Sequence, residues 1–145
     1  MRIVPIYQVM KKIMREVLTI SVLTDLKHTN ELKKALTSAL REVNSQVYYR
    51  KAPTKTNYPY ITYYLKHTKE GYQYNYLWEV HVWTRDIKVA EELADSIEQF
   101  DKSTYKDDMQ AFDVDLNSRN NVEDEDKEIQ HIVLLFNLTY FSMKG

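Results

Sequence analysis

The chain of 145 residues lacks cysteine altogether and contains only two glycines, Gly71 and Gly145. The absence of cysteine excludes disulfide bonds, thiolate nucleophiles and thiolate metal sites. Phosphate-binding loops and dinucleotide-binding turns need several glycines, because the backbone must approach the phosphates closely. The low glycine count therefore excludes many nucleotide-using enzymes.

An excess of charge of one sign is also lacking, because 20 basic and 21 acidic residues leave a net charge of −1. This balance provides no overall attraction to nucleic acid or to an anionic membrane. No apolar run reaches the roughly 18–20 residues that span a bilayer. The basic residues near the N-terminus are interspersed with apolar ones, so we expect no secretory signal. The content of 43% apolar and 28% charged residues is typical of one globular domain.

Two segments have the apolar spacing of amphipathic helices. The first extends from about Glu31 to Val43, and the second from Ile87 to Phe100 with Asp86 as its N-cap. Residues 1–29 also contain helically spaced apolar positions, and we expect them to form an N-terminal extension or arm. The rest of the chain, residues 30–145, is expected to form a single domain.

Strand-like alternation dominates most of the remaining sequence. In the segment around residues 74–84, Trp78 and Val80 fall on one face while His81 and Trp83 fall on the other, which predicts one core face and one mixed face. We therefore expect an α+β fold: a mostly antiparallel sheet of four to five strands, two main helices packed on one face, and the N-terminal helical arm. The expected strands are residues 46–51, 58–66, 74–84, 111–118 and 129–141, with a polar turn at 67–73 and a charged loop at 119–128.

Candidate catalytic residues are few. His81 and His131 lie in expected strands and can be neighbours in the sheet, where Asp113 or Asp115 could approach them. Asp113 and Asp115 share a strand face, and paired carboxylates bind Mg²⁺ or exchange protons. This leaves open a metal-dependent enzyme that uses Asp113, Asp115 and His131. Alternation with apolar neighbours explains the same aspartates as solvent-facing, so the sequence favours a protein that is not an enzyme and needs no metal or cofactor.

Tyrosine is the most unusual feature of the composition, with twelve in the chain. Nine of them, and both tryptophans, fall within residues 48–83. Tyrosine rings are apolar along the body and polar at the tip, which suits protein interfaces. The same rings stack on nucleic-acid bases where a basic groove accompanies them. Some basic charge is supplied by Arg50, Lys51, Lys55, Lys66 and Lys69. A single-stranded nucleic-acid-binding module that uses a tyrosine-rich sheet face is therefore an alternative to a protein interface.

The stretch VYYRKAPTKTNYPYITYYL, residues 47–65, resembles a segment of the small tail-completion proteins of long-tailed bacteriophages. In that family a helix leads to a strand of the pattern V-Y-…-P, and a short loop then leads to P-Y-[IV]. The downstream order is also similar, with an aromatic strand, an acidic helix and a last apolar strand, so the resemblance covers roughly Glu31 to Phe141. The residues that match the motif are Val47, Tyr48, Pro53, Pro59, Tyr60 and Ile61.

This resemblance implies a structural virion protein that assembles as a ring, usually a hexamer, caps the tail tube and joins the tail to the head connector. The implied partners are further copies of the chain, the major tail tube protein, and the head connector or a head-completion protein. DNA would pass through the lumen without specific binding, and no membrane is involved. The implied location is the tail or neck of the virion, with assembly in the host cytoplasm.

We expect contacts with these partners from three segments. Pro53 and Pro59 restrict the loop that leads to the first tyrosines of a strand. The hairpin around residues 67–73 is expected to reach a neighbour or the tail tube. The acidic loop of residues 117–127 would line the lumen, where negative charge lets DNA slide. The expected interface residues are Tyr58, Tyr60, Lys69, Glu70, Tyr72, Tyr74, Glu123, Asp124, Glu125 and Asp126.

Overall fold

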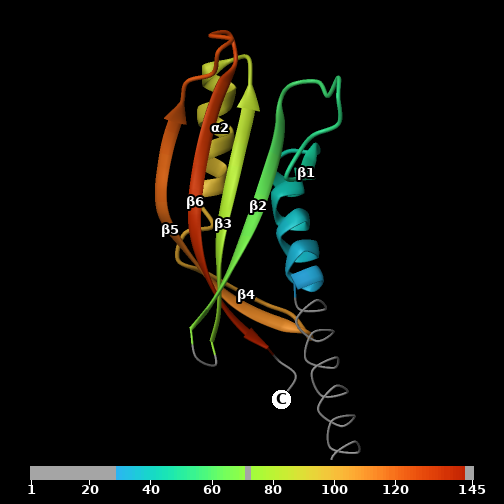
Figure 1. The fold of residues 1–145 in the computed structure, drawn as a ribbon, viewed down its shortest axis with the longest axis vertical. Helices are drawn as coiled ribbons and strands as arrows, with labels where there is room; N and C mark the ends of the chain where they lie inside the picture. Colours follow the sequence, from blue (N-terminus) through green and yellow to red (C-terminus); the bar gives the residue numbers. More distant parts are fainter. Residues whose placement is uncertain (1–28, 71–72, 143–145) are drawn as a thin grey trace, which may run out of the picture.

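The computed structural model of the protein describes residues 29–70 and 73–142. Within them, six strands form one sheet in the order β1-β2-β3-β6-β5-β4 (Figure 1). Neighbouring strands run antiparallel, except that β1 is parallel to β2. The described helices are a first helix at residues 29–43 and α2 (Ile87–Glu98). The strands are β1 (Val47–Tyr49), β2 (Tyr60–Glu70), β3 (Gln73–Thr84), β4 (Ser103–Lys106), β5 (Gln110–Val122) and β6 (Gln130–Ser142).

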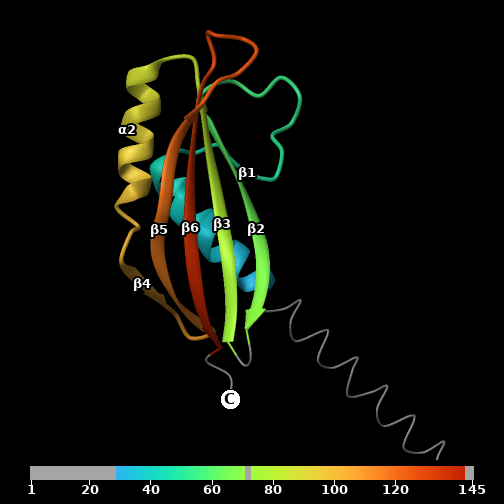
Figure 2. The ribbon, with the colours of Figure 1, turned by 60° about the vertical axis from the view of Figure 1, so that its left-hand side comes forward.

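Both helices pack on the same face of the sheet, as the two views in Figure 1 and Figure 2 show. Each helix turns an apolar stripe toward the sheet, because its apolar residues recur at helical spacing. No helix or strand of the described chain covers the opposite side, which we call the open face. The buried helical side chains include Leu32, Leu36 and Leu40 in the first helix, and Ala90, Ala94 and Ile97 in α2.

Strand alternation determines which side chains enter the core. In β3 the even-numbered residues from Tyr76 to Val82 are buried, whereas the odd-numbered residues from Asn75 to Trp83 are half-buried. The predicted division of this strand into a core face and a mixed face is therefore confirmed. Trp78 is at the centre of the core, with ring centroids 5.0 Å from Phe136 and 6.0 Å from Phe100.

Helix α2 is capped at its start and bonded to β5 in its second half. The carboxylate of Asp86 accepts a hydrogen bond from the backbone N–H of Lys88 at 2.8 Å, as expected of an N-cap. The guanidinium of Arg119 lies 2.7 Å from the carboxylate of Asp95 and 3.3 Å from that of Glu98. The hydrogen bond to Asp95 is the main cause that raises the pKa of Arg119. These contacts link the acidic helix, which packs on β3 and β6, to β5.

The loop between β1 and β2 is fastened at its end. The side-chain amide of Gln46 donates to the backbone carbonyls of Asn57 and Pro59, at 2.9 Å and 3.0 Å. The amide of Asn44 donates to the same Pro59 carbonyl at 3.2 Å. Because these donors come from the connection between the first helix and β1, the loop enters β2 at a fixed place.

The predicted architecture is wrong. The sheet has six strands rather than four to five, one pair of them is parallel, and strands outweigh helices in the described chain. The polar turn predicted at residues 67–73 is shorter, because β2 continues to Glu70 and β3 begins at Gln73. The predicted helical arm at residues 1–29 falls, apart from its last residue, outside the described chain.

The two largest strand errors have a common physical cause, which is a missing apolar alternation. Strand β4 has only four residues, of which three are exposed. Strand β5 continues to Val122, through the first four residues of the charged loop predicted at 119–128. There Arg119 faces the carboxylates of α2, and a bulge between Leu116 and Ser118 shifts the register. Polar partners replace apolar ones on this part of the core side, so the sequence shows no strand pattern.

Candidate interaction surface

The strand register brings residues from four strands into one row at the end of the open face. Tyr60 of β2 pairs with Trp83 of β3, and Trp83 pairs with His131 of β6. His131 in turn pairs with Val122 of β5. Because side chains on one face repeat every two residues, His81 occupies the next row beside the same strands. Aromatic and imidazole rings therefore concentrate at one end of the sheet.

These rings form a continuous stack, which we call the aromatic cluster and define as Tyr58, Tyr60, His81, Trp83 and His131. The ring centroids of Trp83 and His131 are 3.6 Å apart, and those of Tyr60 and Trp83 are 6.1 Å apart. Tyr58 extends the stack at 5.3 Å from Tyr60. His131 is only 9% exposed, whereas the other four rings are half-buried. The cluster therefore presents apolar ring surface to solvent without belonging to the helix-covered core.

Polar contacts fix the directions of these rings. The indole N–H of Trp83 donates to the hydroxyl of Thr62 at 3.0 Å. The guanidinium of Arg85 lies 5.1 Å from the Tyr58 ring centroid and 3.3 Å from the carboxylate of Glu128. Burial is the main cause that raises the pKa of Tyr60, so its phenol stays protonated. Rings held in this way lose little conformational entropy when a partner binds.

The two histidines of the cluster are directly bonded. Nδ1 of His81 lies 2.7 Å from Nε2 of His131, so one nitrogen donates and the other accepts. Burial, and secondly the neighbouring His81, lower the pKa of His131 to about 4, while Asp124 acts in the opposite direction. The carboxylate of Glu79 also faces the pair, at 3.7 Å from Nε2 of His81. His131 is therefore uncharged near neutral pH.

Acidification is expected to destabilise the fold through His131. Its pKa of about 4 lies below the ordinary value of 6.5, so the unfolded state takes up the proton first as the pH falls. The stabilisation is complete above about pH 6.5 and is lost as the pH falls through about 4, to an extent of the order of 3 kcal/mol. Urea unfolding at a series of pH values measures this loss. The variant His131→Phe keeps a ring without the titration, and an equal loss in both proteins would contradict the assignment.

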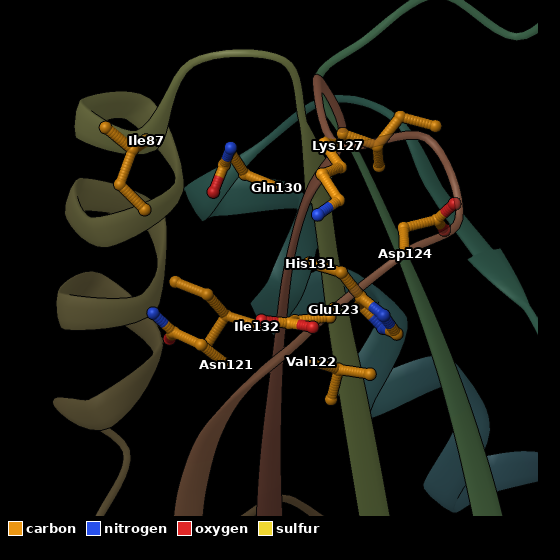
Figure 3. Close-up of a pocket in the computed structure, with 10 residues that line it drawn as sticks. Ile87, Asn121, Val122, Glu123, Asp124, Lys127, Gln130, His131 and Ile132 are labelled. Atoms are coloured by element: carbon orange, nitrogen blue, oxygen red, sulfur yellow. The ribbon is translucent and has the colours of Figure 1, made fainter.

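The loop between β5 and β6 forms an acidic rim beside the aromatic cluster. A depression of about 350 Å³ lies at this end of the sheet. Figure 3 shows residues that line it, among them Glu123, Asp124, Lys127 and His131. Asp124 acts electrostatically on both His131 and Tyr60. The acidic rim and the aromatic cluster are therefore parts of one surface. The exposed carboxylates of the rim are Glu123, Glu125, Asp126 and Glu128.

The structure divides the expected interface residues between the two ends of the sheet. Tyr58 and Tyr60 lie with the acidic residues 123–126 at one end (Figure 1). The hairpin residues lie at the other, because Glu70 is ten residues along β2 from Tyr60, about 33 Å away. Tyr74 stacks on His67 and packs against the core. Tyr72 and the side chains of Lys69 and Glu70 fall outside the described part of the structure.

The three residues of the metal-enzyme alternative do not form one site. Asp113 pairs with Thr139 and Asp115 with Asn137. Asn137 is six residues along β6 from His131, which is about 20 Å. Across residues 29–70 and 73–142, no group of three or more histidine, cysteine, aspartate or glutamate side chains is arranged to hold a metal ion.

Sequence reasoning missed the contributions of Trp83 and Arg85 to this surface. Alternation along β3 places Trp83 on the mixed face with His81, and this pattern could have identified Trp83 as part of the surface. Its contacts with Tyr60 and His131 depend on the pairing of strands that are distant in sequence. The expected proximity of His81 and His131 is confirmed.

Comparisons with known proteins bear on the fold. No protein-family model matches the chain, and no curated protein matches it significantly. Among solved structures, it is similar to a chain of the virion of a native gene transfer agent particle. The alignment covers 70% of this chain and 83% of that chain, with a TM-score of 0.50 and 12% identity. None of the helices in the described segments is long and apolar enough to cross a membrane.

Proposed function

We propose that this protein is a structural component of a phage-like virion, and that it caps the tail tube as a ring and joins the tail to the head connector. The observation that carries the proposal is the similarity of its fold to a chain of a gene transfer agent virion, over most of that chain. The resemblance of residues 47–65 to tail-completion proteins supports the finer role. No catalytic role is assigned to Asp113, Asp115 or His131.

The open face supports this role through its chemistry. The aromatic cluster offers rigid, partly apolar contact area, which is typical of the centres of protein interfaces. The acidic rim beside it repels phosphate, so DNA would pass this end of the molecule without adhering. The proposed partners are other copies of the chain, the major tail tube protein and the head connector.

Disruption of the gene in a phage that carries it tests the proposal. Without a cap, tail tubes should grow past their normal length, and filled heads should accumulate separately from tails. Electron micrographs of the lysate measure both effects, and a plasmid copy of the gene should restore joined particles. Particles of normal length and normal joining would contradict the proposal.

Single-stranded nucleic-acid binding is the second candidate, because one observation favours it. Arg50, Lys51 and Lys55 line a depression of about 440 Å³ together with the aromatic residues Tyr60 and Trp83. Yet the faces of these rings already stack on one another, and the acidic rim lies close by. A gel shift with single-stranded DNA over a range of salt concentrations distinguishes the candidates, since phosphate contacts give a steep salt slope. The proposed virion role predicts weak binding at physiological salt.

A further inference from the structure

The near-zero net charge conceals a strong separation of charge along the chain. Residues 29–68 contain seven basic and two acidic residues, a net charge of +5. Residues 85–130 contain six basic and fifteen acidic residues, a net charge of −9. Such an asymmetry between two halves of one domain creates a directed field that favours particular orientations of a partner.

The fold places the basic segment at one edge of the sheet and the strands of the acidic segment at the other. At the first edge are β1, the loop of residues 50–59 and the first helix, which is held near β2 by the Tyr63 hydroxyl donating to the carbonyl of Lys33 at 3.1 Å. At the other edge are β4 and β5, and the ion pair of Arg119 and Asp95 joins β5 to α2, which packs on β3 and β6. In the upper half of Figure 1 the two edges lie on opposite sides of β6 and β3.

We call the first side the basic edge and define it by Lys33, Arg41, Arg50, Lys51 and Lys55. We call the second side the acidic edge and define it by Asp95 of α2, Asp108 between β4 and β5, and Asp115 of β5. Most of these side chains are exposed, including Lys51 and Lys55 on one edge and Asp108 and Asp115 on the other. Both edges therefore have charge available for a partner.

We propose that the acidic edge of one copy of this chain docks on the basic edge of the next. The inference deepens the proposed ring and rests on it. Two basic edges repel each other, as do two acidic edges, so a symmetric pair of like edges is disfavoured. Contact between unlike edges is head-to-tail, and such contacts generate a ring when the rotation closes. The charge separation thus selects the kind of interface that a tube cap needs.

Side chains, rather than an added strand, make this contact. The bulge between Leu116 and Ser118 interrupts the free edge of β5, and bulges discourage strand addition. The backbone N–H of Leu116 is already bonded to the carboxylate of Asp101 at 2.7 Å. Because the contact is largely between exposed charges, assembly should weaken as salt is added.

Charge reversal on each edge tests the proposal. The variants are Lys51→Glu with Lys55→Glu on the basic edge, and Asp108→Lys with Asp115→Lys on the acidic edge. Each should raise the dissociation constant for assembly of the purified chain about tenfold or more, measured by sedimentation velocity. An equimolar mixture of the two variants should assemble again, because each reversed edge then meets an edge of opposite charge. The control variant, Lys88→Glu with Lys106→Glu, makes the net charge as negative as the basic-edge variant does and should not weaken assembly.

The outcomes separate this inference from the proposed function. Wild-type rings that persist in both edge variants would overturn the edge assignment and leave the ring in place. An equimolar mixture of the two edge variants that does not assemble would also overturn the edge assignment. A wild type that remains monomeric, alone and with tail tubes, would overturn the ring itself. Loss of single-stranded DNA binding in the basic-edge variant, with assembly intact, would identify that edge as a nucleic-acid surface instead.

Discussion

Substitution of Trp78 by alanine is expected to destabilise the protein by about 3–5 kcal/mol. The side chain is 1% exposed and lies between the first helix, Phe100 and the centre of the sheet. Its ring packs on Phe136 and Phe100, so truncation leaves a cavity that neither layer can fill. Since domains of this size are stable by about 5–15 kcal/mol, the variant should lose a large part of its stability in urea denaturation.

The phenylalanine variant of the same residue is the matched control. Among the residues that the structure describes, no group accepts a hydrogen bond from the buried indole N–H of Trp78. Trp78→Phe removes this unsatisfied donor and keeps an aromatic ring, so its cost should be below about 1.5 kcal/mol. A loss equal to that of the alanine variant would mean that the indole N–H is bonded in solution.

Substitution of Tyr58 by alanine is expected to leave a folded protein that caps tail tubes poorly. Tyr58 is half-buried in a loop and stacks on Tyr60 beneath the guanidinium of Arg85. Its removal should change the free energy of unfolding by less than about 1 kcal/mol. Aromatic residues at the centre of an interface typically contribute about 2 kcal/mol or more. Binding to tube ends should therefore weaken by about 30-fold or more, as measured by co-sedimentation with purified tubes.

Tyr63 in the same segment provides the contrast. Its ring is 1% exposed, and its hydroxyl bonds to Thr37 at 2.7 Å. Tyr63→Ala should cost about 3–5 kcal/mol of stability, as for other large aromatic residues in a core. If Tyr58→Ala unfolds the protein while tube binding by the remaining folded fraction is unchanged, the aromatic cluster is a structural element and the interface lies elsewhere.

The sequence predicted those elements whose partners are apolar. Helix α2 is recognisable from Ala90, Ala94 and Ile97, because their spacing reflects burial on one side. The alternation around Trp78 in β3 is equally direct. Strand β4 and the end of β5 lack this pattern, since Arg119 finds its partners among carboxylates of α2. An ion pair that forms only in the folded state produces no apolar periodicity in the sequence, so this strand could not be recognised.

The interaction surface was predictable only in its composition. The excess of tyrosine indicated a contact surface, and the prolines marked where Tyr58 and Tyr60 enter the sheet. The contacts between Tyr60, Trp83 and His131 depend on the pairing of β2, β3 and β6. The register of these strands is a property of the whole sheet. For the same reason, the hairpin residues could not be separated from the acidic residues 123–126 before the ends of the strands were known.

Electron microscopy of the purified protein mixed with purified tail tubes tests the central claim most directly. The tubes should be prepared from particles that lack this protein, so that their ends are free. We expect ring-shaped densities at the tube ends, and tubes that no longer elongate when tube subunits are added. Bare tube ends that continue to grow, beside a protein that remains monomeric, would contradict the account.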